Sequence, residues 1–192
     1  MKALISVSNK TGIVDFCKNL SDCEIELIST GGTFDLLTQS GLSVENVLDI
    51  TEYKKPVDSI IKTLYPEIYA GISANRNDNV QMKQLANCNI SPIDFVVVNL
   101  FPFESFSENT TLSIDDCLDY IDIGGPTMLR SAAKSYKNIV VVSDPSDYPL
   151  IIKELKSNSN VSTETRKYLM KKVFTATANY DVMISKFIDK NL

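Results

Sequence analysis

Short runs of apolar residues alternate with polar loops and helical patterns along the first fifty residues of the chain. Apolar runs at residues 3–7, 24–28 and 44–50 predict three strands, because turn-forming residues bound each of them. Residues 13–20 and 34–37 carry apolar side chains at the spacing of an amphipathic helix. A chain that alternates strand, loop and helix in this way predicts a parallel sheet flanked by helices.

The rest of the chain continues this pattern and then becomes mainly helical. Residues 95–100 begin with an unbroken apolar run and predict a central strand buried on both faces, and residues 139–142 predict another buried strand. Helices are predicted around residues 80–85, 114–121, 148–156 and 163–187, the last of them capped by Ser162 or Thr163. The sequence therefore predicts one α/β domain over residues 1–192 with a helical C-terminal segment.

One polar motif interrupts the pattern with two glycines, a proline and two opposite charges. Asp122 stands just before Gly124, Gly125 and Pro126, and an alanine-rich helical segment then ends at Lys134. Proline suits the first position of a helix, so a helix of about three turns is predicted from Pro126. Its first free amides would face Asp122. On these residues alone, the motif is either a binding site or a capped helix.

Composition narrows the possible functions. The 192 residues carry a net charge of −5, which argues against a nucleic-acid-binding protein, and no run is long enough to span a membrane. The four cysteines lack the spacing of a zinc site and predict reduced thiols in a cytoplasmic protein. The chain has no histidine. Proton transfer must therefore use lysine, acidic residues, tyrosine, cysteine, the backbone or water.

Two polar loops after the first two predicted strands suggest a phosphate site. Residues 8–12 read Ser-Asn-Lys-Thr-Gly and residues 30–33 read Thr-Gly-Gly-Thr. Each loop opens a helix, where free amides, hydroxyls and a lysine favour an anion. Parallel strands present such loops at one edge of the sheet, and Asn99 ends the central strand at the same edge. Its amide would read the polar edge of a heterocycle or cap a turn.

Six segments of the chain resemble the IMP cyclohydrolase domain of the bifunctional purine-biosynthesis proteins that also carry AICAR transformylase. The most specific match is I-D-I-G-G-P-T-M-L-R-S-A-A-K at residues 121–134. The others lie at residues 5–12, 28–33, 62–64, 97–103 and 174–181. The resemblance covers essentially the whole chain and implies a methylglyoxal-synthase-like fold, with three α/β/α layers around a mainly parallel sheet.

The resemblance also implies a homodimer and one reaction, the closure of FAICAR to IMP with loss of water, without a metal or organic cofactor. It implies nucleotide contacts at Ser8, Asn9, Lys10, Thr30, Gly31, Gly32, Thr33, Lys62, Thr63, Val98, Asn99, Asp122 and Ile123. The chain ends at Leu192, about where the family's linker to the transformylase domain begins, so that domain is expected on a separate or fused chain segment.

The implied reaction needs a base, an acid and a fixed positive charge. The carboxamide nitrogen is a poor nucleophile, so we expect Asp122 to take its proton as the bond to the formyl carbon forms. We expect Lys134 to protonate the formyl oxygen and Lys62 to stabilise its developing negative charge. No other molecule need be brought in, because both reacting groups belong to one substrate.

The sequence departs from the family pattern near this site. Ile60 replaces an arginine, Tyr65 and Tyr69 replace histidines, Phe101 replaces a tyrosine and Asn9 replaces an acid. A catalytically weakened or regulatory nucleotide-binding domain therefore remains an alternative. A methylglyoxal-synthase-like lyase acting on a triose phosphate is a second one, although such a lyase is expected to use a histidine.

Overall fold

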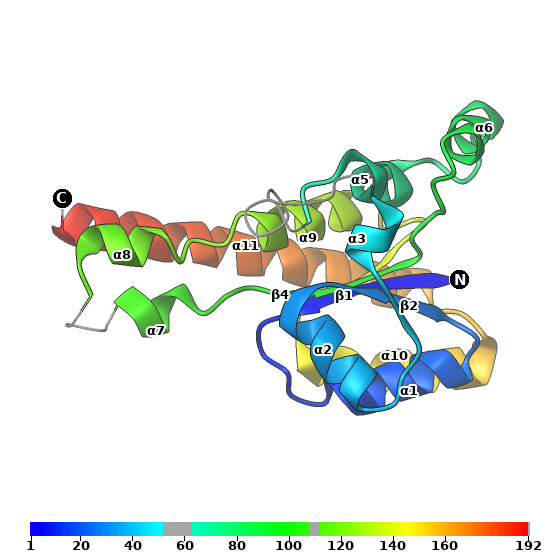
Figure 1. Cartoon of the computed structure of the whole chain (residues 1–192), viewed down its shortest axis with the longest axis horizontal. Helices are drawn as coiled ribbons and strands as arrows, with labels where there is room; N and C mark the ends of the chain where they lie inside the picture. Colours follow the sequence, from blue (N-terminus) through cyan, green and yellow to red (C-terminus); the bar gives the residue numbers. More distant parts are fainter. Residues whose placement is uncertain (52–62, 108–111, 192) are drawn as a thin grey trace.

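Five parallel strands form the central sheet of the computed structural model, which describes residues 1–51, 63–107 and 112–191 (Figure 1). The strand order is β3-β2-β1-β4-β5. The strands are β1 (Lys2–Val7), β2 (Glu26–Ser29), β3 (Val44–Asn46), β4 (Phe95–Asn99) and β5 (Val140–Val142). The chain builds the sheet outward from β1 on one side and from β4 on the other. The point where the order reverses therefore lies between β1 and β4, which pair in parallel with Val7 opposite Asn99.

Helices cover both faces of this sheet. One layer contains α1 (Ile13–Asp22), α2 (Gly31–Gln39) and α10 (Tyr148–Asn158), and the other contains α5 (Pro66–Ser73), α9 (Gly124–Lys134) and α11 (Thr163–Asn191) (Figure 1). Shorter or peripheral elements are α3 (Val47–Ile50), α6 (Asn79–Asn87), α7 (Phe103–Ser107), α8 (Ile114–Leu118) and the 3₁₀ turn η1 (Pro145–Asp147). The predicted three-layer α/β/α architecture is confirmed.

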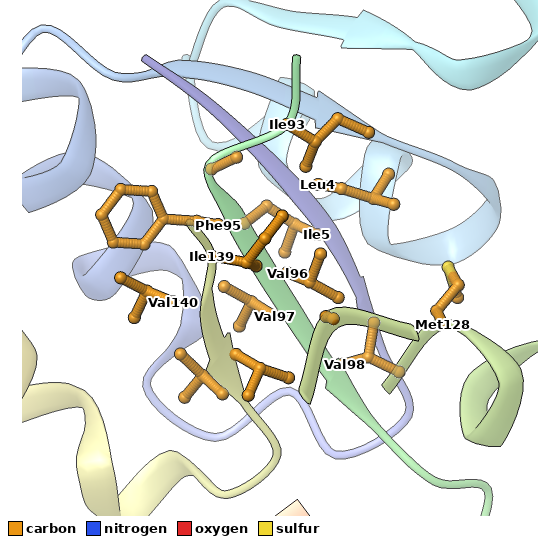
Figure 2. Close-up of a cluster of buried hydrophobic side chains, with 14 of the residues drawn as sticks. Leu4, Ile5, Ile93, Phe95, Val96, Val97, Val98, Met128, Ile139 and Val140 are labelled. Atoms are coloured by element: carbon orange, nitrogen blue, oxygen red, sulfur yellow. The ribbon is translucent and has the colours of Figure 1, made fainter. Parts of the chain in front are cut away.

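The core lies where β1, β4 and β5 meet the helices. Residues 95–98 of β4 are buried without interruption, as predicted for a central strand covered on both faces. Figure 2 shows Phe95 to Val98 beside Leu4 and Ile5 of β1, with Met128 of α9 reaching the same cluster. Close-packed side chains thus surround the central strands β1 and β4. A site at the carboxyl ends of these strands would have a rigid base.

Two local predictions were wrong, and one helix was missed. The expected strand at residues 44–50 ends at Asn46, because the Asn46 side chain accepts the Leu48 N–H at 3.0 Å and starts α3. No helix was expected over Pro66–Ser73, yet Pro66 stands at the first turn of α5, where proline is favoured. Helix α9 begins at Gly124 rather than at Pro126, so the proline takes the third position, where its missing N–H still costs nothing.

Other expectations hold. Ser162 begins the C-terminal helix, since its Oγ accepts the Thr165 N–H at 3.2 Å. All four cysteines are free, and burial raises the pKa of the Cys17 thiol to about 12. In the part of the chain that the structure describes, no helix combines the length and hydrophobicity needed to cross a membrane.

Candidate functional site

A cavity of about 700 Å³ opens at the carboxyl ends of β1, β2 and β4. Its walls come from the loop after β1, the loop after β2, the end of β4 and the start of α9. This is the strand-order reversal point, where ligands bind in open parallel sheets. The volume is that of a small-molecule site. A smaller recess of about 390 Å³ at the start of β2 carries Glu24, Glu26 and Glu45, which would repel an anionic ligand.

The β1 and β2 side of the cavity is built to receive an anion. Helix α2 starts at Gly31, and no side chain caps its free amides. Gly31 has a φ of 53°, and a Cβ added at Gly31 or Gly32 would meet no atom within 4 Å, so the space over this helix start is open. Backbone amides exposed at a helix start are a common phosphate-binding arrangement.

Lys10 and Thr33 join the two polar loops. The Lys10 ammonium donates to Thr33 Oγ1 at 2.6 Å and to the Val7 carbonyl oxygen. Thr33, 3% exposed, also accepts the Val7 N–H at 3.2 Å. Burial lowers the pKa of Lys10, and among the described residues no carboxylate forms an ion pair with it. An anion bound in the cavity would therefore compensate a partly desolvated positive charge.

Asn99 braces this side of the cavity rather than presenting its whole amide to a ligand. Its Oδ1 accepts the Ser8 N–H at 2.7 Å and the Asn9 N–H at 2.8 Å, and its Nδ2 donates to the Asn9 carbonyl oxygen at 2.9 Å. The turn-capping interpretation of Asn99 is thus the one that the contacts favour. One amide hydrogen is left for another partner.

Asp122 is fixed at the β4 side of the same cavity. Its Oδ1 accepts the Gly125 N–H at 2.8 Å, and its Oδ2 accepts the Phe101 N–H at 3.2 Å. The Asp122 N–H donates to the Tyr180 hydroxyl of α11 at 2.9 Å. The carboxylate therefore has one defined orientation, with backbone donors on both oxygens.

The two glycines of the motif are required by close contacts. A Cβ at Gly125 would lie 2.4 Å from Asp122 Oδ2, and a Cβ at Gly124 would lie 2.4 Å from Thr63 Oγ1. Either contact would force a neighbouring group to shift. The glycine pair thus lets the start of α9 approach both Asp122 and Thr63.

Tyr69 of α5 also lies near Asp122. Burial raises the pKa of its phenol to about 12, and the charge of Asp122 contributes to the rise, while the Thr127 side chain opposes it. Sequence reasoning recorded Tyr69 only as a departure from the family pattern. It missed Tyr180 as a site residue altogether, although residue 180 falls in one of the matching segments.

Lys134 does not reach this cavity within one chain. Helix α9 has 11 residues, which separates its ends by about 16 Å along the axis. Gly124 and Gly125 line the cavity, whereas Lys134 is exposed in the last turn and does not. Within one chain the helix therefore separates Lys134 from Asp122, and the role of Lys134 as general acid stays a prediction.

Comparisons with known proteins place the chain in a family. A family model described as the MGS-like domain matches residues 12–127, more than half of the chain. This chain belongs to the MGS-like domain family. A second model, described as AICARFT/IMPCHase bienzyme, matches residues 132–192.

Two relatives of this MGS-like chain carry the same name. "Bifunctional purine biosynthesis protein PurH" of Caldicellulosiruptor saccharolyticus is 48% identical over 97% of this chain and 36% of that protein. PurH of Bacillus mycoides is 45% identical over 100% of this chain and 37% of that protein. The chain thus spans a little over a third of the length of these relatives. A solved structure titled "Crystal structure of ForH" superposes with a TM-score of 0.84 at 29% identity, covering 98% of each chain.

The MGS-like structure brings most of the residues predicted to contact a nucleotide to one cavity. Its lining includes Ser8, Lys10, Thr30, Gly31, Gly32, Thr33, Thr63, Val98, Asn99, Asp122 and Ile123. Asn9 is outside the lining; it is exposed, and its Oδ1 accepts the Thr11 N–H at 2.9 Å. Lys62 and Ile60 lie outside the described residues. No group of three or more potential metal ligands occurs within residues 1–51, 63–107 and 112–191.

Proposed function

We propose that this chain binds a purine nucleotide of the FAICAR/IMP type and closes the ring of FAICAR to give IMP and water. The observation that carries the proposal is that one cavity is lined by the fixed carboxylate of Asp122 and by the two anion-type loops, residues 8–12 and 30–33. The similarity to PurH proteins over the whole chain supports it. These relatives are bifunctional by name, and we propose that the transformylase activity belongs to a part of such proteins outside this segment. We also propose that the chain works as a cytoplasmic homodimer.

In this proposal, the nucleotide lies with its phosphate at the start of α2 and its base beside Asp122. Lys10 supplies the positive charge under the phosphate end, and the amides of Gly31 and Gly32 supply hydrogen-bond donors. The reacting groups of FAICAR, a carboxamide and a formamide, then face the β4 side of the cavity. Orientation supplies a large part of the rate, because the reaction is intramolecular.

Ring closure requires two proton removals and one oxygen departure. Asp122 accepts the first carboxamide proton as the nitrogen–carbon bond forms, and the formyl oxygen becomes a hydroxyl by taking a proton. The hydroxyl then leaves as water after a second protonation, while the former formamide nitrogen loses its proton and forms the double bond to the same carbon. The two protons given to the oxygen balance the one removed from the carboxamide nitrogen and the one removed from the formamide nitrogen.

We assign the acid to Lys62 rather than to Lys134. Lys62 precedes Thr63, which lines the cavity, whereas Lys134 stands at the far end of α9. A lysine beside the reacting oxygen would both stabilise the developing charge and donate the proton. We expect Lys62→Met to lower the rate about 10²- to 10³-fold, and Lys83→Met, an exposed change on α6, to leave it unaltered. Equal rates in both variants would contradict the assignment.

The deciding experiment is turnover by the purified chain. FAICAR is added, and IMP formation is followed by ultraviolet absorbance. The binding of IMP is measured separately by calorimetry. Turnover supports the proposal. Failure of both FAICAR and IMP to bind would remove it.

A regulatory or catalytically weakened nucleotide-binding domain is the second candidate. It is favoured by Phe101, which lines the cavity beside Asp122 but carries no hydroxyl, where the family pattern has a tyrosine. Its signature is IMP binding without FAICAR turnover. The lyase alternative predicts instead that a triose phosphate releases inorganic phosphate, which a phosphate assay detects.

A further inference from the structure

Three aromatic side chains gather at the Asp122 side of the cavity. The ring centroids of Phe106 and Tyr120 are 4.1 Å apart, those of Phe101 and Phe106 are 4.9 Å apart, and those of Phe101 and Tyr120 are 5.7 Å apart. All three pairs are stacked, with interplanar angles of 24°, 29° and 7°. The rings therefore form one cluster with a common orientation.

Two of these rings line the cavity and the third supports them. Phe101 and Tyr120 belong to the cavity wall, whereas Phe106 does not. Phe106 stacks on both wall residues, so it holds their rings in place from outside the cavity. A wall whose rings are held in this way costs little conformational entropy when a ligand packs against it.

The aromatic wall is joined directly to the carboxylate. The Phe101 N–H donates to Asp122 Oδ2 at 3.2 Å, and Tyr120 precedes Asp122 by two residues. Tyr120 is 38% exposed, which is unusual for a large ring in a stacked cluster. The polar loops of β1 and β2 stand on the other side of the cavity, so the rings and the anion-type loops divide its lining into an aromatic and a polar part.

We propose that Phe101 and Tyr120 form a stacking wall for the planar heterocycle of the bound nucleotide, and that Tyr120 makes this chain prefer nucleotides over base-free sugar phosphates. The inference rests on the proposed function. The loops and Asp122 offer polar groups for the phosphate and the edge of the base, and the ring faces supply the apolar contact that a heterocycle requires. Stacking of a base on an aromatic side chain contributes substantially to nucleotide affinity.

The test compares two ligands that differ only by the base. Dissociation constants of IMP and of ribose 5-phosphate are measured by calorimetry for the wild type, Tyr120→Ala and Tyr120→Phe. We expect Tyr120→Ala to weaken IMP binding about tenfold, while ribose 5-phosphate binding and the affinity of Tyr120→Phe for IMP stay at wild-type values. Phe174→Ala is the matched control, because Phe174 is an aromatic residue of 39% exposure on α11 outside the cavity.

A second variant keeps the test open if Tyr120→Ala fails to fold. The chain contains no tryptophan, so Tyr120→Trp creates a single reporter. We expect IMP, but not ribose 5-phosphate, to change its fluorescence at saturation.

Three outcomes overturn the stacking wall. The first is an unchanged affinity of Tyr120→Ala for IMP. The second is an equal loss of IMP affinity in Tyr120→Phe, which would indicate a hydrogen bond from the phenol. The third is an equal weakening of IMP and ribose 5-phosphate binding in Tyr120→Ala. Each of these leaves IMP binding by the wild type intact, so the proposed function stands. Wild-type protein that binds ribose 5-phosphate but not IMP would remove both proposals.

Discussion

The two ends of helix α9 differ in every property that matters for chemistry. At its start, Asp122, Gly124 and Gly125 meet the cavity, and backbone amides fix the carboxylate. At its end, Lys134 is exposed, about 16 Å along the axis. The two charged residues belong to one highly specific sequence motif, yet only one of them reaches the site in this chain. A motif records which residues occur together in sequence, and the helix decides which of them share a cavity.

The largest expected effect is a loss of the ring-closure rate when Asp122, at the start of α9, is changed. Asp122→Asn keeps the shape of the side chain but removes the base, so we expect ring closure to slow by about 10²- to 10⁴-fold. The measurement is the initial rate of IMP formation from FAICAR. Asp189→Asn, an exposed change near the end of α11, serves as the control and should keep the wild-type rate. Wild-type activity in Asp122→Asn would remove Asp122 from the mechanism.

A smaller effect tests the glycine contact at the same end. The methyl group of Gly125→Ala would lie 2.4 Å from Asp122 Oδ2 and must displace a carboxylate that the Phe101 amide holds. We expect a loss of about 1–3 kcal/mol in unfolding free energy, or about 2–4 °C in Tm per kcal/mol. Gly32→Ala is the control for stability, since its new methyl group meets no atom within 4 Å. If Gly125→Ala and Gly32→Ala had the same Tm, the close approach at Gly125 would not contribute to stability.

The link from α9 to α11 should contribute less. Tyr180→Phe removes the oxygen that accepts the Asp122 N–H, and we expect a loss of about 1 kcal/mol together with a modest fall in the ring-closure rate. Chemical denaturation measures the first quantity and the FAICAR assay the second. Tyr136→Phe is a suitable control, because its hydroxyl makes no hydrogen bond to any residue that the structure describes. Identical stability in the two variants would argue against the Tyr180 link.

The smallest effect belongs to the far end of the helix. Lys134 lies in the last turn, where a positive charge offsets the helix dipole, so Lys134→Met should cost about 0.5 kcal/mol and leave the rate of ring closure unchanged. A hundredfold loss of activity would instead place Lys134 in the cavity of a second copy of the chain. Mixing Lys134→Met with Asp122→Asn then distinguishes the two cases, since only a shared site would regain activity.

Much of the fold could be predicted because β4 and the alternation around it carry strong local signals. Residues 95–98 are apolar without interruption, and such a run favours a strand covered on both faces. The helix start at Val47 was missed because one hydrogen bond, from the Leu48 N–H to the Asn46 side chain, decides it. Helix α5 was missed because its eight residues lie between segments with weak periodicity, and Pro66 was its clearest local sign.

The site was predictable in composition and less so in geometry. The loops after β1 and β2, Asp122 and the glycine pair were found from residue type and position along the chain. Tyr69 and Tyr180 come from two other segments of the chain, so only packing brings them beside Asp122. In the sequence alone, these tyrosines look like ordinary core or surface tyrosines.

The sequence by itself determined the order of strands and helices, the anion-type loops and the acid that precedes the Gly-Gly-Pro turn, because these features depend on neighbouring residues. Tertiary structure decided which of them meet. Parallel pairing of β1 with β4 brings Ser8, Asn9 and Asn99 together, and the close approach allowed by Gly125 brings the start of α9 against Asp122. The rigid rise of α9 removes Lys134 from the same place, because 1.5 Å for each helical residue cannot be shortened.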